Sequence, residues 1–183
     1  MARFLRGTLT HALLQFLPDL PKAQWAQAAK AFVDRRGAEL PARARTGIVK
    51  EVRAIFDDAV FGALFGSDSR AEVAFVAEIA RPDGQKGAPL RVSGQIDRLV
   101  VGGDRVLIVD YKTNRAPPAL VEAVPETYLL QLAAYRLALR KIYQKQAVEA
   151  AIVWTDGAVL MPIPVALLDA AEQRLWALEA AKR

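Results

Sequence analysis

The chain has 183 residues, of which 53% are hydrophobic, and it carries a formal net charge of +5. This length suits one domain with a buried core, and the apolar content excludes wholesale disorder. The sequence contains no cysteine, which excludes disulfides, iron–sulfur clusters and cysteine-ligated zinc, so any bound metal has to be held mainly by oxygen.

The positive charge is concentrated at the start of the chain. Residues 1–55 hold ten lysines and arginines against four acidic residues, whereas the rest is nearly balanced. Such a basic region favours binding to nucleic acid, although solvated helix faces give the same pattern. Arg3 and Arg6 precede an apolar stretch that resembles a signal or transit peptide, but an amphipathic helix fits the stretch better. No apolar run reaches the length of a membrane span, so we expect a cytoplasmic protein.

Helical spacing of apolar residues predicts three helices in the first third of the chain. The first begins at Thr8 as its cap and ends before Pro18. The second covers about 22–36, and the third runs from about 42 to 61.

The pattern then changes to the alternation that is typical of strands, at residues 71–79, 90–101 and 105–111. Four further elements follow in order: a helix over 125–143, a strand over 148–155, a short strand over 159–162 and a helix over 165–182. This order predicts one mixed α/β domain over 1–183, with a helical part over 1–66, a core over 67–163 and a last helix over 164–183.

The second and third strands are joined by a turn signal, Gly102-Gly103-Asp104. If the turn is centred on Gly103 and Asp104, or is a four-residue loop over 102–105, Asp97 faces Asp110 with the Cβ atoms about 5 Å apart. A turn centred on Gly102 and Gly103 instead leaves Asp110 diagonal to Asp97, on the same face.

Strand alternation also places Lys112 beside Asp110. Two carboxylates this close repel each other unless a cation lies between them, which indicates a site for a hard divalent metal. A surface salt bridge of Lys112 with Asp97 or Asp110 is the alternative, and the geometry alone does not choose between them. The strongly apolar strand that leads to Asp110 favours function.

Gln131 and Tyr135 lie one turn apart on the following helix and therefore share a face. By itself this pair is ordinary amphipathic helix chemistry.

Taken together, these residues resemble a known family. The RecB-type branch of the PD-(D/E)XK nucleases, and within it the nuclease domain of AddA-type helicase–nuclease subunits, is similar in four places: Gly94-Gln95-Ile96-Asp97-Arg98, Val109-Asp110-Tyr111-Lys112-Thr113, Gln131 with Tyr135, and His11 after Gly7. The resemblance implies a restriction-endonuclease-like core, with a mixed sheet of four to five strands flanked by helices and with extra helices before it. Since the helicase region is absent from this sequence, we expect an excised domain, with a free-standing nuclease as the alternative.

The resemblance also implies roles for these residues. His11, Asp97, Asp110 and the backbone carbonyl of Tyr111 are expected to hold Mg²⁺, for which Mn²⁺ can substitute, and Asp97, Asp110 and Lys112 are expected to be catalytic. Arg98, Thr113, Gln131 and Tyr135 are expected to contact DNA or to support the site. The single histidine has a helix-capping or core role as its alternative. Glu72 aligns loosely with an acidic position of the family, and a strand-surface charge is the better interpretation of it.

The function implied is metal-dependent hydrolysis of DNA, preferably single-stranded, by the nuclease domain of a double-strand-break repair helicase–nuclease. Its partners are then a helicase region of the same full-length chain and a second helicase–nuclease subunit. The alternatives are a free-standing exonuclease and a DNA-binding module that kept the fold but lost the chemistry. Intact Asp97, Asp110 and Lys112 argue against the last of these, and the missing cysteines argue against iron–sulfur relatives.

Overall fold

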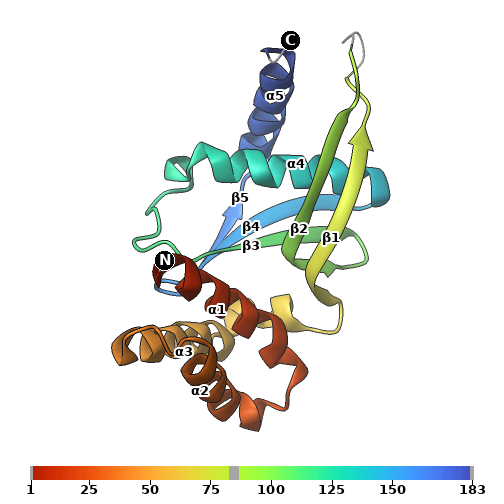
Figure 1. Ribbon diagram of the computed structural model, residues 1–183. Coiled ribbons are helices and arrows are strands. Elements are labelled where there is room, and N and C mark those ends of the chain that lie inside the picture. Colours follow the sequence, from red (N-terminus) through yellow and green to blue (C-terminus); the bar gives the residue numbers. More distant parts are fainter. Residues whose placement is uncertain (1, 83–86, 182–183) are drawn as a thin grey trace. The chain divides into compact units, whose positions relative to one another are not determined.

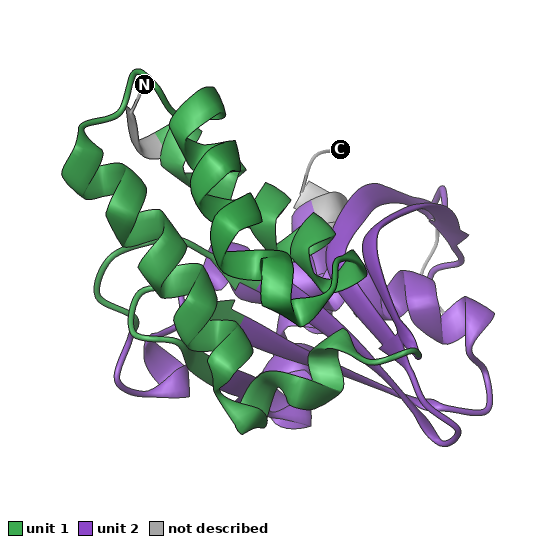
Figure 2. Ribbon diagram, turned by 90° about the horizontal axis from the view of Figure 1, so that it is seen from below, with its two compact units in different colours: residues 1–67, 111–117, 153–160 green, residues 68–110, 118–152, 161–183 purple. Residues whose placement is uncertain are grey.

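A computed structural model of the chain describes residues 2–82 and 87–181, which group into two compact units (Figures 1 and 2). The helical unit comprises residues 1–67, 111–117 and 153–160, and the sheet unit comprises residues 68–110, 118–152 and 161–183. Position 182, where the terminal helix was expected to end, lies outside the described residues.

The helical unit is built from three helices and three short 3₁₀ turns in its first segment: α1 (Ala2–Phe16), η1 (Leu17–Asp19), η2 (Lys22–Gln24), α2 (Trp25–Arg36), α3 (Ala42–Asp57) and η3 (Ala59–Phe65). Apolar residues at helical spacing are buried here, as Leu13 and Leu17 illustrate. Aromatic rings add to this core: the centroids of Phe16 and Phe32 are 5.0 Å apart. The three predicted helices are therefore present.

Two helix ends differ from the sequence prediction. α1 begins at Ala2 instead of Thr8, and the Thr8 hydroxyl donates to the Phe4 carbonyl one turn earlier, so Thr8 is an interior residue. α3 ends at Asp57 because Asp58 leaves the helical region, with φ −92° and ψ 123°. The Asp58 side chain accepts a hydrogen bond from the Val60 amide and begins η3.

The sheet unit contains most of a sheet and the two helices that pack with it. Among the described residues, five strands form one sheet in the order β1 (Ser69–Ile79), β2 (Leu90–Val101), β3 (Arg105–Lys112), β4 (Ala147–Trp154) and β5 (Val159–Ile163). The last residues of β3 and β4 and the first of β5 belong to the helical unit. The helical elements are η4 (Val121–Ala123), α4 (Glu126–Ile142) and α5 (Val165–Ala181).

The strand directions make the sheet mixed. β1–β2 and β2–β3 are antiparallel pairs. The Ala147 amide donates to the Asp104 carbonyl and the Thr155 amide to the Lys112 carbonyl, so residue numbers rise together along β3 and β4, and these strands run parallel. The predicted mixed α/β fold, with a sheet of four to five strands flanked by helices, is confirmed.

In the sheet unit α4 crosses the long β1–β2 hairpin (Figure 1). The ring of Tyr135 in α4 meets that of Phe75 in β1 edge to face, with centroids 5.1 Å apart. Arg136, one residue later, is buried and joins α4 to β4 and α5. None of the helices among the described residues is long and apolar enough to cross a membrane.

Candidate active site

The β2–β3 hairpin has the register that brings the two aspartates together. Arg98 pairs with Val109 and Val101 with Val106, and the Gly102 amide donates to the Arg105 carbonyl across the loop. One residue beyond Arg98 and Val109, the same register sets Asp97 opposite Asp110. Facing residues share one face of the sheet, so these two carboxylates are neighbours in the sheet unit. Asp110 is buried, with 4% of its surface exposed, and Asp97 is half-buried.

Glu72 in β1 adds a third carboxylate. The β1–β2 register pairs Ala71 with Arg98 and Val73 with Ile96, so Glu72 lies across from Asp97. A carboxylate oxygen of Glu72 lies within 4.8 Å of one of Asp97. Glu72 also has a φ of +52°, in the left-handed region that a glutamate rarely adopts. A strained backbone that brings two acidic side chains together is a feature of functional sites.

The strand-surface interpretation of Glu72 therefore misses its place in the site. Glu72, Asp97 and Asp110 form an acidic row across three neighbouring strands. Such a row repels itself electrostatically and is suited to a hard divalent cation bound through oxygen.

Lys112 and Tyr111 continue β3 beyond Asp110. Strand alternation returns Lys112 to the face of Asp110 and turns the Tyr111 side chain to the other face. The Lys112 carbonyl accepts a hydrogen bond from the Thr155 amide at 3.0 Å, which fixes this strand end to β4. The Tyr111 side chain is buried.

His11 lies in the interior of α1, so its helix-capping alternative is wrong. Within the helical unit its half-buried ring meets the ring of Tyr111 edge to face, with centroids 5.6 Å apart. Tyr111 is the residue that directly follows Asp110 in the chain.

Gln131 and Tyr135 contact each other on α4, where the Gln131 amide nitrogen donates to the Tyr135 hydroxyl at 3.0 Å. The Tyr135 ring rests on β2 where Gly94 has no side chain, since a Cβ there would lie 2.8 Å from Cε1 of the ring. The helix pair is thus set against the strand that carries Asp97.

Arg98 and Thr113 flank the acidic residues. Arg98 is buried and donates to the Ser69 hydroxyl at 3.0 Å, an arrangement that suits support of the strand better than a contact with DNA. Thr113 is half-buried, and its carbonyl accepts a hydrogen bond from Arg6 at 2.7 Å.

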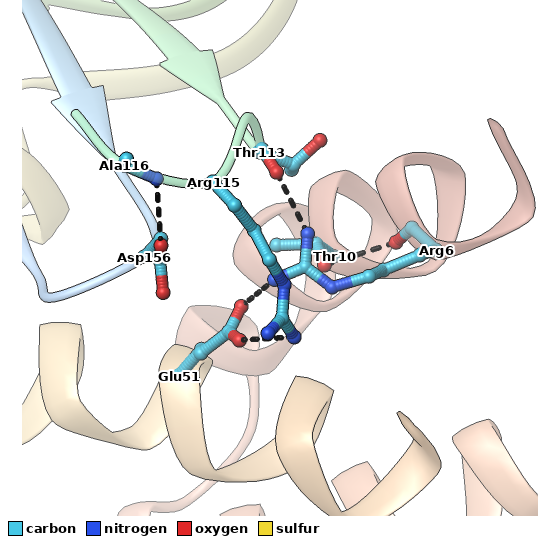
Figure 3. A network of polar contacts seen from close by, with 7 residues as sticks. All are labelled: Arg6, Thr10, Glu51, Thr113, Arg115, Ala116 and Asp156. Carbon is cyan, nitrogen blue, oxygen red and sulfur yellow. Dashed lines mark hydrogen bonds and ion pairs between the residues drawn. The ribbon is translucent and has the colours of Figure 1, made fainter. Parts of the chain in front are cut away.

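The Arg6 contact belongs to a polar network in the helical unit that the sequence analysis missed (Figure 3). Arg6 also pairs with Glu51 of α3, and Arg115 lies 4.0 Å from the same carboxylate. Burial raises the pKa of the Glu51 carboxyl above its ordinary value, and Arg6 opposes this effect. The Asp156 carboxylate accepts a hydrogen bond from the Ala116 amide at 3.0 Å. The position of Arg6 directly before Gly7 was the one sequence signal for this network.

Comparison with known proteins agrees with the motifs. The family model described as the PD-(D/E)XK nuclease superfamily matches residues 1–181. An ATP-dependent helicase/nuclease subunit from Anoxybacillus flavithermus is 27% identical over 166 residues, which cover 87% of this chain and 13% of that protein. The protein of the same name from Bacillus cereus is 26% identical over 169 residues, which cover 83% of this chain and 14% of that protein. The chain thus spans about one seventh of the length of these relatives.

A solved structure shares the fold. The crystal structure of a candidate exonuclease from Eubacterium rectale superposes with a TM-score of 0.53 at 11% identity, covering 95% of this chain and 63% of that one. At this identity the likeness concerns the fold alone.

Proposed function

Because the chain belongs to the PD-(D/E)XK nuclease superfamily, we propose that it is a metal-dependent deoxyribonuclease that hydrolyses phosphodiester bonds. The observation that carries this proposal is the acidic row in the sheet unit, in which Asp97 faces Asp110 and Glu72 approaches Asp97. Lys112 follows Asp110 after one intervening residue, on the same face of β3.

The donor set fits a hard divalent ion. Asp97 and Asp110 are the proposed principal ligands, with Glu72 beside them and, by the family resemblance, His11 and the Tyr111 carbonyl as further ligands. Carboxylate and carbonyl oxygens with one imidazole favour Mg²⁺ or Mn²⁺, and the absence of cysteine from the sequence leaves no thiolate for an iron–sulfur cluster. Such an ion supplies Lewis-acid chemistry, in which it activates water and offsets charge on the phosphate.

Lys112 is the proposed group that acts on the reacting atoms without holding the metal. Its ammonium group donates hydrogen bonds that orient the attacking water or stabilise negative charge as it develops on the phosphate. Gln131 and Tyr135 are proposed to contact the DNA backbone, Arg98 to support β2, and Thr113 to support the peptide after Lys112.

In its biological setting we infer a role as the nuclease domain of a larger cytoplasmic repair enzyme. The relatives named as helicase/nuclease subunits are about seven times longer than the matched region. This length supports two partners, which are a helicase region in the same full-length chain and a second helicase–nuclease subunit. The motor would then deliver single-stranded DNA to this domain.

Metal dependence is the first test. Cleavage of labelled single-stranded DNA should require Mg²⁺ or Mn²⁺ and stop with EDTA, whereas Ca²⁺ should bind yet support little turnover because its looser coordination positions water poorly. Robust cleavage in EDTA would sink the proposal.

Three variants separate the roles. Asp97→Asn and Asp110→Asn should lose cleavage and weaken Mn²⁺ binding in calorimetric titration. Lys112→Ala should lose cleavage by about a hundredfold or more but keep most Mn²⁺ binding. Asp104→Asn, a carboxylate change in the loop of the same hairpin, is the matched control and should cleave normally. Near-normal cleavage by Lys112→Ala would show that its assigned role is wrong.

A further inference from the structure

The guanidinium of Arg6 bridges two segments of the helical unit (Figure 3). Its Nη1 donates to the Thr113 carbonyl at 2.7 Å, and its Nη2 pairs with the Glu51 carboxylate of α3. The side chains of Arg6 and Glu51 are only 12% and 15% exposed. Partial burial protects this ion pair from the screening that weakens exposed pairs.

The segment that Arg6 holds is the one that directly follows Lys112. The Lys112 carbonyl is fixed by the Thr155 amide at 3.0 Å, and the Ala116 amide is fixed by Asp156 at 3.0 Å. Ala116 has a φ of +59°, a conformation that an alanine holds only when its surroundings impose it. The carbonyl that accepts from Arg6 lies between these two anchors.

α1 approaches the same peptide closely. A Cβ added at Gly7 would lie 3.3 Å from Oγ1 of Thr113, so the helix carries a glycine where it meets this residue. The Thr10 hydroxyl donates to the Arg6 carbonyl at 3.0 Å and stabilises the turn from which Arg6 projects. The position of Thr113 is thus determined from α1 by a close contact and a charged hydrogen bond.

The chemistry of the contact requires arginine. A guanidinium presents several N–H donors in a rigid planar fork, so one arm can reach the carbonyl while another stays on the carboxylate. A lysine ammonium is a single point on a flexible chain and cannot hold both groups in this geometry.

We propose that Arg6 and Glu51 are positioning residues that fix the peptide after Lys112 and thereby direct the Lys112 ammonium group. This inference rests on the proposed nuclease function. Arg6 and Glu51 act through Thr113 and touch neither the metal ligands nor the substrate. Their effect should therefore appear in the rate of the chemical step rather than in metal or substrate binding.

The first test is Arg6→Gln. We expect kcat on single-stranded DNA to fall about tenfold to a hundredfold, because small displacements of a catalytic group are costly. KM and the affinity for Mn²⁺ should stay within about twofold by the same reasoning. The matched control is Arg53→Gln, which removes the exposed Arg53–Asp57 pair on α3 and should leave kcat unchanged.

The charge exchange Arg6→Glu with Glu51→Arg separates positioning from fold stability. The exchanged pair can restore the ion pair and hence the melting temperature, but a carboxylate at position 6 cannot donate to the Thr113 carbonyl. We expect Tm to recover while kcat stays low. Recovery of both, or a folded Arg6→Gln protein with normal kcat, would overturn the proposal.

A readout without activity keeps this test independent of the proposed function. In NMR spectra Arg6→Gln should shift the amide resonances of Thr113 and Asn114 and speed hydrogen exchange over 111–116, whereas Arg53→Gln should do neither. If the wild-type chain cleaves no DNA, the nuclease proposal fails, but unchanged resonances would still be needed to reject the Arg6 contact. If Arg6→Gln does not fold, Arg6→Lys replaces it, and normal kcat in that variant overturns the proposal.

Discussion

At the scale of single residues, Gly94 determines whether the Tyr135 ring can rest on β2. A Cβ at this position would lie 2.8 Å from Cε1 and 3.0 Å from the hydroxyl oxygen of Tyr135. We therefore expect Gly94→Ala to lower the free energy of unfolding by about 1–3 kcal/mol, the usual cost of overpacking. Urea unfolding measures this loss.

Two comparisons isolate the cause of that loss. In a Tyr135→Ala background the Gly94→Ala change should cost much less, because the opposing ring is gone. Gly103→Ala is the control, since a Cβ there would meet nothing within 4 Å. An equal loss in both backgrounds would show that the ring is not the reason for the glycine.

The residues of the site differ in how far sequence could predict them. Asp97 and Asp110 could be paired because a short glycine-containing turn fixes the register of their hairpin. Glu72 could not, because the longer connection over 80–89 leaves the β1–β2 register open and a left-handed glutamate has no local sequence signal. Arg6 and Glu51 are 45 residues apart, and only the packing of α1 with α3 brings them together.

At the scale of elements, existence and type were predictable and the ends were not. Periodicity predicted every long helix and strand, but the start of α1 depends on whether Thr8 caps a helix or lies within one. Thr8 supports both, and the exposed Phe4 before it gives no apolar signal for the extra turn. The end of α3 depends in the same way on the side chain of Asp58.

Arg136 ties α4 to its neighbours through a buried cation. Its guanidinium lies 2.7 Å from Asp169 and 2.7 Å from Glu172 of α5 and donates to the Val148 carbonyl of β4. Arg136→Met should lower the free energy of unfolding by about 3–5 kcal/mol, because it leaves the mostly buried Glu172 carboxylate without this partner. Urea unfolding checks the value.

The neighbouring Arg140 supplies the control. It lies 3.5 Å from Glu172 with 53% of its side chain exposed, so Arg140→Met should cost less than about 1 kcal/mol. Adding Glu172→Leu to Arg136→Met should recover stability by removing the buried charge. Similar losses in Arg136→Met and Arg140→Met would contradict this account of α4.

The pairing of α1 with α3 should depend on pH through Glu51. This carboxyl faces Arg6, Arg115 and Asp156, and burial raises its pKa above the ordinary 4.5. The folded protein therefore binds this proton more tightly than the unfolded chain. The contribution of Glu51 to stability is complete below pH 4.5 and is lost as pH rises through the raised pKa.

We accordingly expect the free energy of unfolding of the wild type, relative to Glu51→Gln, to decrease as pH rises above 4.5. Urea unfolding of both proteins at a series of pH values measures the difference. Lys50→Gln, a change at the adjacent position, should show a constant difference over the same range. A difference that grows with pH would mean that Arg6 outweighs burial at Glu51.

At the scale of the whole molecule, the modest charge predicts weak and salt-sensitive engagement of DNA. The net charge is +5, and electrostatic attraction extends only about 8 Å at physiological salt. The sequence has no Walker-type phosphate loop, so this chain has no ATP-driven means of separating strands. We expect slow, non-processive cleavage of single-stranded DNA, with blunt duplex resistant.

Time courses on labelled single-stranded and blunt duplex oligonucleotides at two salt concentrations test this expectation. The Lys112→Ala protein controls for a contaminating nuclease. Faster cleavage of blunt duplex, or rates that do not change with salt, would favour a free-standing nuclease over a domain fed by a motor.

The mixed direction of the sheet has a consequence for how the chain folds. β1–β2 and β2–β3 are hairpins whose connections are far shorter than the segment between β3 and β4, and the parallel β3–β4 pair closes only after the whole of α4 has formed between them. Loop closure over a longer segment costs more entropy before any contact repays it. We expect the hairpin with Asp97 and Asp110 to form early and the Thr155–Lys112 bond late. The acidic row would then exist before the lysine beside it is held in place.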